Sequence, residues 1–139
     1  MNQLRYQREL DDTVEAADYA LKCLRQAKSE LKVASNLGLW DMLGGGMFVT
    51  FAKRNKMRKA QDAMNEAKRA LSRFSTELSN VDRRYALNLD LDGFLGFADY
   101  FFDGVVSDFL VQNKIDQAKH EVDHAISEVE SIRKDLLVL

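Results

Sequence analysis

The pentapeptide His120-Glu121-Val122-Asp123-His124 has the H-E-x-x-H spacing of zinc peptidases, in which two histidines one helical turn apart bind the metal. A peptidase also needs a third ligand and a sheet edge that holds the substrate. Only Glu128, on the same predicted helix, is near enough to serve, and no strand is predicted. We therefore expect His120 and His124 to lie on the surface, with adventitious zinc binding as the alternative.

The segment from Asn88 to Asp99 nearly matches a calcium-binding loop. Such loops place acidic or amide side chains at positions 1, 3 and 5, a glycine at 6 and a bidentate glutamate at 12. Here Asn88, Asp90 and Asp92 precede Gly93, and the shorter Asp99 stands at the twelfth position. A polar turn with two buried leucines explains the segment equally well, so calcium binding is an alternative and not the expectation.

Three further features lack the partners that chemistry would need. The glycines at 44–46 are not followed by the Lys-Ser/Thr of a phosphate-binding loop. Asp99 and Asp103 are one helical turn apart, but nothing near them in the sequence supplies a substrate pocket. Cys23 has no neighbouring histidine or acidic group that would activate a thiol. We expect no catalytic residue, no cofactor and no enzymatic activity.

Charge is unevenly distributed along the chain. The formal net charge is −1 over residues 1–52, +6 over 53–84 and −7 over 85–139, which sum to −2. Five of the seven residues from Lys53 to Lys59 are basic. No aromatic residues are interleaved with them and the protein as a whole is acidic, so we expect no nucleic-acid binding. The simpler interpretation is that a basic helix lies beside an acidic one.

The elements that must position these residues are three long helices. Apolar residues recur at alternating intervals of three and four, the spacing of a coiled-coil seam. The first helix is expected over about 3–34 and to end at Ser35, Asn36 and Gly38; the second follows Asn55, and the third opens at Asn113. The expected seams are Leu10, Val14, Ala17, Leu21, Leu24 and Leu31; Met57, Ala60, Met64, Ala67, Leu71, Phe74, Leu78, Val81 and Tyr85; and Ile115, Ala118, Val122, Ala125, Val129, Ile132, Leu136 and Leu139.

An internal repeat relates the last two helices. When the chain is shifted by 58 positions, Leu37–Ala67 lies over Leu95–Ala125 without a gap and nine residues coincide. Each copy has an aromatic insert with glycines, an Asn-Lys pair and a heptad helix. We therefore predict an all-α fold over a single domain, 1–139: an antiparallel three-helix, coiled-coil-like bundle that runs up-down-up, with two short helical inserts. The repeat units span about 37–85 and 95–139.

The inserts hold most of the aromatic residues. We expect these side chains to cover the ends of the bundle and any excess to form a surface for a partner or a second copy. In the second insert Asp99, Asp103 and Ser107 would form an acidic stripe, which is unsuited to an anionic membrane surface. The predicted partner-binding residues are Trp40, Phe48, Phe97, Phe101 and Phe102.

Composition restricts the cellular setting. One cysteine cannot form an internal disulfide, and no run of 18 uncharged apolar residues exists, so we expect a cytoplasmic protein without a transmembrane segment. The expected function is a non-enzymatic interaction or scaffold protein with a protein partner or a homo-oligomer. The alternative is a metal-binding regulatory protein.

The segment Trp40-Asp41-Met42-Leu43-Gly44-Gly45-Gly46, with Asn55-Lys56 and Asn113-Lys114-Ile115, resembles a family of small helical bacterial proteins of unknown function. The resemblance covers about residues 36–125. It implies a helical, cytoplasmic protein and no activity.

Overall fold

The computed structural model describes residues 3–42, 47–106 and 114–139, and in these ranges all side chains except those of 37–42, 47–53, 102 and 103. The elements are α1 (Gln3–Met42), α2 (Met47–Tyr85), α3 (Asp92–Tyr100), a π-helical turn η1 (Phe101–Val105) and α5 (Ile115–Leu137). No strand occurs within the described ranges. The predicted all-α bundle is thereby confirmed.

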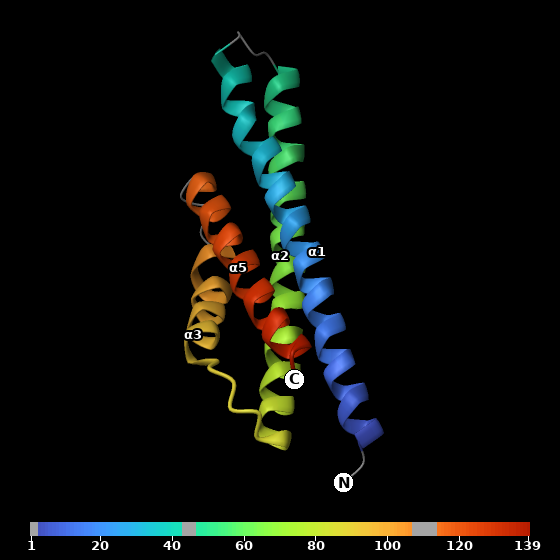
Figure 1. Cartoon of the computed structure of the whole chain (residues 1–139). Helices are drawn as coiled ribbons and strands as arrows, with labels where there is room; N and C mark the ends of the chain where they lie inside the picture. Colours follow the sequence, from blue (N-terminus) through green and yellow to red (C-terminus); the bar gives the residue numbers. More distant parts are fainter. Residues whose placement is uncertain (1–2, 43–46, 107–113) are drawn as a thin grey trace.

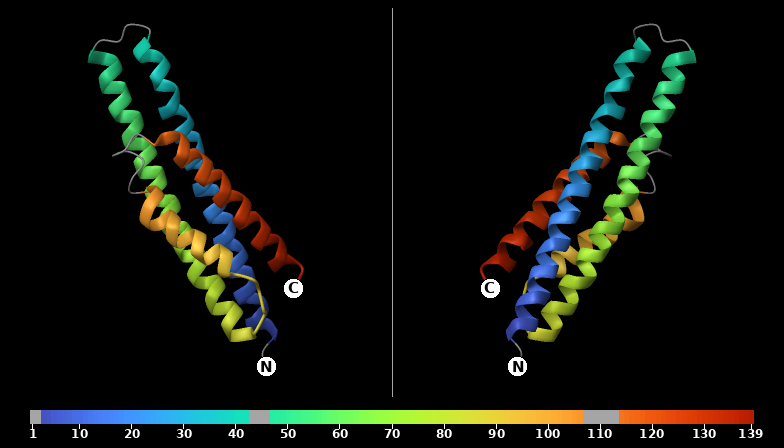
Figure 2. Two further views of the ribbon diagram at one scale, coloured as in Figure 1. Left: turned by 90° about the vertical axis from the view of Figure 1, so that its left-hand side faces the viewer. Right: turned by 90° about the vertical axis from the view of Figure 1, so that its right-hand side faces the viewer.

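Two helical hairpins make up the bundle. The long helices α1 and α2 lie antiparallel, and the shorter pair of α3–η1 and α5 packs along one side of them (Figures 1 and 2). The start of α1 and the end of α5 lie toward the same end of the bundle, away from Met42 at the end of α1 and Met47 at the start of α2 (Figure 1). None of the described helices is long and apolar enough to cross a membrane.

The direction of the third long helix differs from the prediction. Asp18 contacts Arg133, and Lys28 contacts Asp123. As the residue number increases along α1, the number of the residue that it meets on α5 therefore decreases. Both α2 and α5 are therefore antiparallel to α1 and run the same way as each other (Figure 1). The expected up-down-up order is wrong because α3 is a fourth packed helix, which returns the chain before α5 begins.

The helices of the first hairpin are longer than predicted. Gly38 does not end α1, which continues to Met42, and α2 begins at Met47 and not after Asn55. The first insert is therefore not a separate short helix. A glycine inside a helix costs only about 1 kcal/mol relative to alanine, and without proline no residue here blocks the backbone. Ser35 also does not cap a helix end, because its hydroxyl donates to the Lys32 carbonyl one turn back.

The predicted seams form the core. Of their residues, Val14, Met57, Tyr85 and Ile115 are half-buried and Leu139 is 50% exposed. All the other seam residues are buried. The long helices approach closely because many of the buried residues are small, namely Ala16, Ala17, Ala20, Ala27, Ala34, Ala60, Ala67 and Ala70. Thr13 is the one buried polar residue of the described part, and its hydroxyl donates to the Glu9 carbonyl.

The second aromatic insert forms the layer that covers α2. Phe94 is 2% exposed, and its ring packs edge-on against Phe74 of α2 at a centroid distance of 5.7 Å. Leu91, Phe101, Val105 and Val106 belong to the same buried cluster. The insert therefore packs along the side of the long hairpin, where the sequence had predicted a cover for the bundle end.

Candidate functional site

The α1–α2 hairpin projects beyond the shorter helices. Near the start of α5, Lys119 Nζ lies 3.4 Å from Ser35 Oγ of α1. Past this level, α1 and α2 continue together without α3 or α5 beside them (Figures 1 and 2). We call this part, residues 35–42 and 47–59, the hairpin end. At the opposite end, α1 and α2 also extend past α3 and α5, and there the connection from α2 to α3 runs beside them (Figures 1 and 2).

The basic stretch identified in the sequence belongs to the hairpin end. Arg54, Arg58 and Lys59 are exposed and Lys56 is half-buried. No acidic side chain among the described residues lies within ion-pair distance of these four groups. Arg54, Arg58 and Lys59 therefore lie at the surface, which is where a basic group can attract an anionic partner.

The expected pairing of the basic helix with the acidic one is wrong for the described residues. The acidic side chains of α5 contact α1 instead: Glu130 Oε1 lies 2.7 Å from Arg25 Nη2, and Asp123 Oδ1 lies 2.8 Å from Lys28 Nζ. The basic residues of α2 nearer its C-terminal end contact α2 itself or α1, as in the pairs Arg69–Glu66 and Arg84–Glu9.

Two of the predicted partner-binding residues, Trp40 and Phe48, stand on the hairpin end. Their side chains lie outside the described residues, as does that of Phe102. The backbone places Trp40 within the last turn of α1 and Phe48 within the first turn of α2. These two aromatic residues therefore lie on neighbouring helices at the far end of the bundle.

The other two predicted partner-binding residues do not lie on a free surface. Phe101 is 0% exposed, so the folded monomer does not offer it to a partner. Phe97 is half-buried, with its ring 6.1 Å from that of Phe101 and 4.4 Å from the imidazole of His124. The predicted surface of the second insert is thus largely part of the core.

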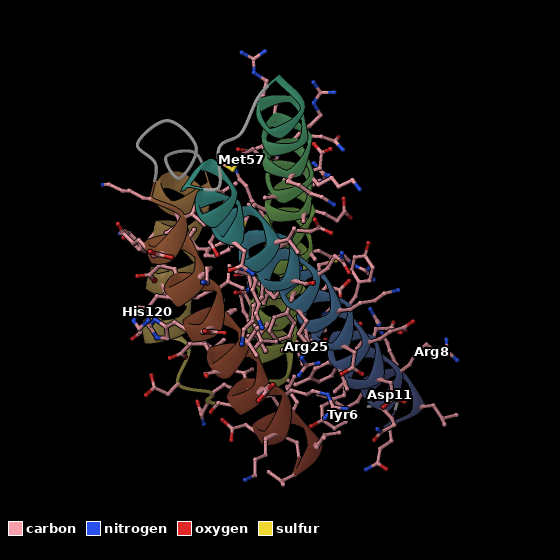
Figure 3. The ribbon with its side chains drawn as sticks, turned by 90° about the horizontal axis from the view of Figure 1, so that it is seen from above. Tyr6, Arg8, Asp11, Arg25, Met57 and His120 are labelled. Carbon is pink, nitrogen blue, oxygen red and sulfur yellow. The ribbon has the colours of Figure 1, made fainter. Side chains whose placement is uncertain are left out.

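Both histidines of the H-E-x-x-H segment lie on the outer face of α5, as expected. His120 is exposed and points away from the bundle (Figure 3), whereas Val122 between them is fully buried. His124 has Glu128 Oε1 at 3.3 Å from Nε2 and Glu121 Oε2 at 4.0 Å from Nδ1. These contacts are side-by-side pairs along one helix, so they do not assemble the three-ligand site of a zinc peptidase.

The start of the calcium-like segment is hydrogen-bonded to the last turn of α2. Leu87 N–H donates to the Asp82 carbonyl at 3.2 Å, and Leu89 N–H donates to the Asp82 carboxylate at 3.0 Å. Asp92 begins α3 and Asp99 lies seven residues further along it, about 10.5 Å along the axis. A calcium loop instead brings its first and twelfth positions to one ion.

No group of three or more His, Cys, Asp or Glu side chains within the described ranges is placed to hold a metal ion. The metal candidates Asn88, Asp90, Asp92, Asp99, His120 and His124 are distributed over a loop and two helices, and all of them are exposed.

The structure also brings together a polar cluster that the sequence did not reveal. The Tyr19 hydroxyl donates to Glu66 Oε1 at 3.0 Å, and this hydrogen bond raises the pKa of Tyr19 to about 12. Arg69 Nη2 lies 2.6 Å from Glu66 Oε2, and it lowers the pKa of that carboxyl together with Tyr19. Burial raises the pKa of the adjacent Cys23 thiol. A neutral phenol and a neutral thiol form a structural contact between α1 and α2 rather than an activated nucleophile.

A second polar contact between α1 and α2 surrounds a cavity of about 180 Å³ near the chain ends. Glu9 and Glu77 line it, and each has one buried carboxylate oxygen, Oε2, without a hydrogen-bond partner among the described residues. The pKa of Glu9 is lowered by the Tyr85 hydroxyl and by Arg84 and Arg5. Its charge is therefore already compensated by its own neighbours.

Comparison with known proteins found no matching family model, no matching curated protein and no matching solved structure.

Proposed function

We propose that this protein is a non-enzymatic interaction or scaffold protein that binds a partner, or a second copy of itself, through the hairpin end. One observation supports this most strongly: at the end opposite the N-terminus, α1 and α2 extend past α3 and α5, with no other described segment beside them (Figures 1 and 2). Of the residues predicted to bind a partner, Trp40 and Phe48 stand on this part of the chain.

The composition of the hairpin end supports the same proposal. A helix pair covered by other helices uses its apolar residues in the core, but two helices alone cannot enclose a wide apolar surface. The apolar residues of the hairpin end between 37 and 51 are Leu37, Leu39, Trp40, Met42, Met47, Phe48, Val49 and Phe51. Large aromatic side chains in such a place are the usual anchors of binding surfaces.

The arrangement of the reactive side chains favours binding over catalysis. The metal candidates Asp90, Asp92, Asp99, His120 and His124 are exposed and lie on a loop and two helices. The buried part of the described structure is apolar apart from Thr13. A catalytic site needs several polar groups that converge on one substrate, and the described residues supply contacts between helices instead.

The test compares two double variants. Trp40→Asp with Phe48→Asp changes the hairpin end, and Leu137→Asp with Val138→Asp makes the same chemical change at exposed apolar positions of the opposite end. Sedimentation velocity over a range of concentrations measures self-association, and the fluorescence of an apolar dye measures accessible apolar surface. We expect the wild type and the Leu137/Val138 variant to bind the dye, and the Trp40/Phe48 variant to lose most of this binding. Equal dye binding and equal mass for all three proteins would contradict the proposal.

A further inference from the structure

The exposed residues of α2 between Arg54 and Arg84 are basic or neutral with one exception. Twelve residues of this range are exposed, of which seven are basic, four are neutral and polar, and one, Asp62, is acidic. They are Arg54, Asn55, Arg58, Lys59, Asp62, Arg69, Ser72, Arg73, Thr76, Asn80, Arg83 and Arg84. None of the twelve is apolar.

Part of this set forms a stripe along the side of α2 that faces away from the bundle. The stripe follows intervals of four and seven residues, which place side chains on one face of a helix. Its members are Arg54, Arg58, Asn65, Ser72, Thr76 and Arg83. From Arg54 to Arg83 the stripe is about 44 Å long, at 1.5 Å for each of 29 residues (83 − 54).

More than half of the exposed basic groups have no acidic partner. Three of the seven pair with half-buried glutamates of α1 or α2, namely Arg69, Arg73 and Arg84. The other four have no carboxylate within ion-pair distance among the described residues: Arg54, Arg58, Lys59 and Arg83. Arg83 donates to the amide oxygen of Asn80, which is neutral and leaves the guanidinium charge uncompensated.

We infer that this outward face of α2 docks on the phosphate backbone of a double-stranded nucleic acid. Basic side chains that neutralise phosphates release condensed counterions, and this release supplies the binding free energy. Exposed amide and hydroxyl groups such as those of Asn55, Ser72 and Asn80 add hydrogen bonds to phosphate oxygens. Phosphate contacts carry no sequence information, so the binding is independent of base sequence. The inference goes beyond the proposed function, because it does not use the apolar residues of the hairpin end.

The composition of the face distinguishes a duplex from other anionic partners. A protein partner is bound through an apolar, often aromatic centre, and a lipid surface through inserted apolar side chains. Single-stranded nucleic acid is bound on aromatic side chains that stack with the bases. Because the twelve exposed residues include no apolar or aromatic side chain, they fit the polar and positively charged type of interface that duplexes require.

The net charge of the chain does not oppose this contact. The expectation of no nucleic-acid binding rested on the acidity of the whole protein and on missing aromatic residues, and the second reason concerns single strands only. The exposed charged residues of α5 are mainly acidic, with Lys134 against Asp116, Asp123, Glu130 and Asp135. Since α2 and α5 lie on opposite sides of the bundle (Figure 2), the acidic surface of α5 is directed away from the duplex.

The acidic residues of α3 restrict the direction of approach. Asp92 and Asp99 are exposed on this helix, which packs beside α2. The duplex should therefore lie on the stripe and toward α1, the side to which Arg84 reaches in its contact with Glu9.

The first experiment measures binding to a labelled DNA duplex of mixed sequence by fluorescence anisotropy. A stripe of about 44 Å corresponds to about 13 base pairs at 3.4 Å each, so a duplex of about 24 base pairs accommodates it. If the four unpaired basic groups each contact one phosphate, the logarithm of the affinity falls with the logarithm of salt with a slope of about −3.6. We expect about a 150-fold loss of affinity between about 50 and 200 mM salt.

The second experiment compares two variants with the same total charge. Arg54→Gln with Arg58→Gln removes two unpaired charges from α2, whereas Lys114→Gln with Lys134→Gln removes two exposed charges at and within α5. The α2 variant should bind more weakly and lose only about twelvefold over the same salt range, because its slope falls to about −1.8. The α5 variant should bind as the wild type does. Circular dichroism confirms that both remain helical.

The outcomes separate this inference from the proposed function. Absence of duplex binding at low salt, equal loss in both charge variants, or tighter binding of the single strand overturns the inference. So does binding to polyglutamate or to phosphatidylglycerol vesicles that equals binding to the duplex. The Trp40/Phe48 double variant should bind the duplex as the wild type does. If that variant alone loses self-association and accessible apolar surface while no protein binds DNA, the proposed function stands and the duplex inference fails.

Discussion

The sharpest stability prediction concerns the end of α2. Ala86, the residue after Tyr85, has a φ of 50°, which is the left-handed conformation. Leu87 N–H donates to the Asp82 carbonyl five residues back, so this helix end has the Schellman hydrogen bond with alanine where glycine is usual. The left-handed conformation is unfavourable for an L-residue because its Cβ crowds the following carbonyl oxygen. That cost is about 1–2 kcal/mol.

Replacement of Ala86 by glycine should stabilise the protein. Glycine removes the steric cost of about 1–2 kcal/mol. It also loses more conformational freedom on folding than alanine does, and this loss destabilises the folded protein by about 0.5–1 kcal/mol. The net gain in the free energy of unfolding is about 0.5–1 kcal/mol, or a rise of about 2–4 °C in Tm for a chain of this size. Chemical denaturation followed by far-UV circular dichroism measures it, with an unchanged m value as the sign that the unfolded state is comparable.

The same substitution within α2 provides the control. Ala63 is half-buried in a regular part of the helix, where glycine costs about 1 kcal/mol. Ala86→Gly and Ala63→Gly should therefore shift the unfolding free energy in opposite directions. If Ala86→Gly destabilises the protein as much as Ala63→Gly does, the left-handed helix end is not the conformation that the folded protein holds in solution.

Three further predictions concern buried and paired side chains. Phe101→Ala should lower the unfolding free energy by about 3–5 kcal/mol because it removes a fully buried ring, and half-buried Phe97→Ala should cost clearly less; equal losses would contradict the core position of Phe101. The pKa of Tyr19 is raised above its usual value, so the stability it contributes is complete below pH 10 and is lost as pH rises through about 12; Tyr19→Phe should flatten this alkaline loss in denaturation curves. The thiol of Cys23 is buried with a raised pKa, so a disulfide-exchange reagent should label it slowly in the native protein and rapidly in denaturant, and equal rates would show an accessible thiol.

The core could be predicted from the sequence because every turn of a packed helix must place an apolar residue against its neighbours, and heptad spacing shows which residues these are. Each long helix must present one continuous apolar stripe to its neighbours, and residues such as Leu24, Met64 and Val122 are fully buried as their spacing indicates. The outward position of His120 and His124 followed from the same stripe, because Val122 between them occupies the seam.

The helix ends and the packing partners could not be predicted in the same way. Gly38 and Asn55 are unfavourable inside a helix by at most about 1 kcal/mol each, and this small cost does not stop a helix whose other residues favour it. The sequence predicted that the aromatic residues of the inserts, Phe94 and Phe101 among them, cover the ends of the bundle, but it did not indicate which element they meet. Because α3 packs on α2, the chain reverses once more and the charged side chains of α5 reach α1.

The polar clusters depended on distances between helices that spacing along one helix does not contain. Tyr19 and Glu66 are 47 residues apart and meet only because α1 and α2 are antiparallel with a particular register. The sequence does hold one signal for this contact, because Tyr19 stands next to Ala20 and Glu66 next to Ala67. A search for polar residues beside the alanines of two facing helices would have found the pair.

The packing of α5 on α1 has a consequence for the order in which the chain can fold. The contacts between α1 and α2, between α2 and α3, and between α3 and α5 all join successive elements, whereas α5 reaches back across most of the chain to α1. During synthesis the first hairpin can therefore assemble before residues 115–137 exist, and the apolar stripe of α1 that receives α5 waits uncovered until the ribosome has completed them.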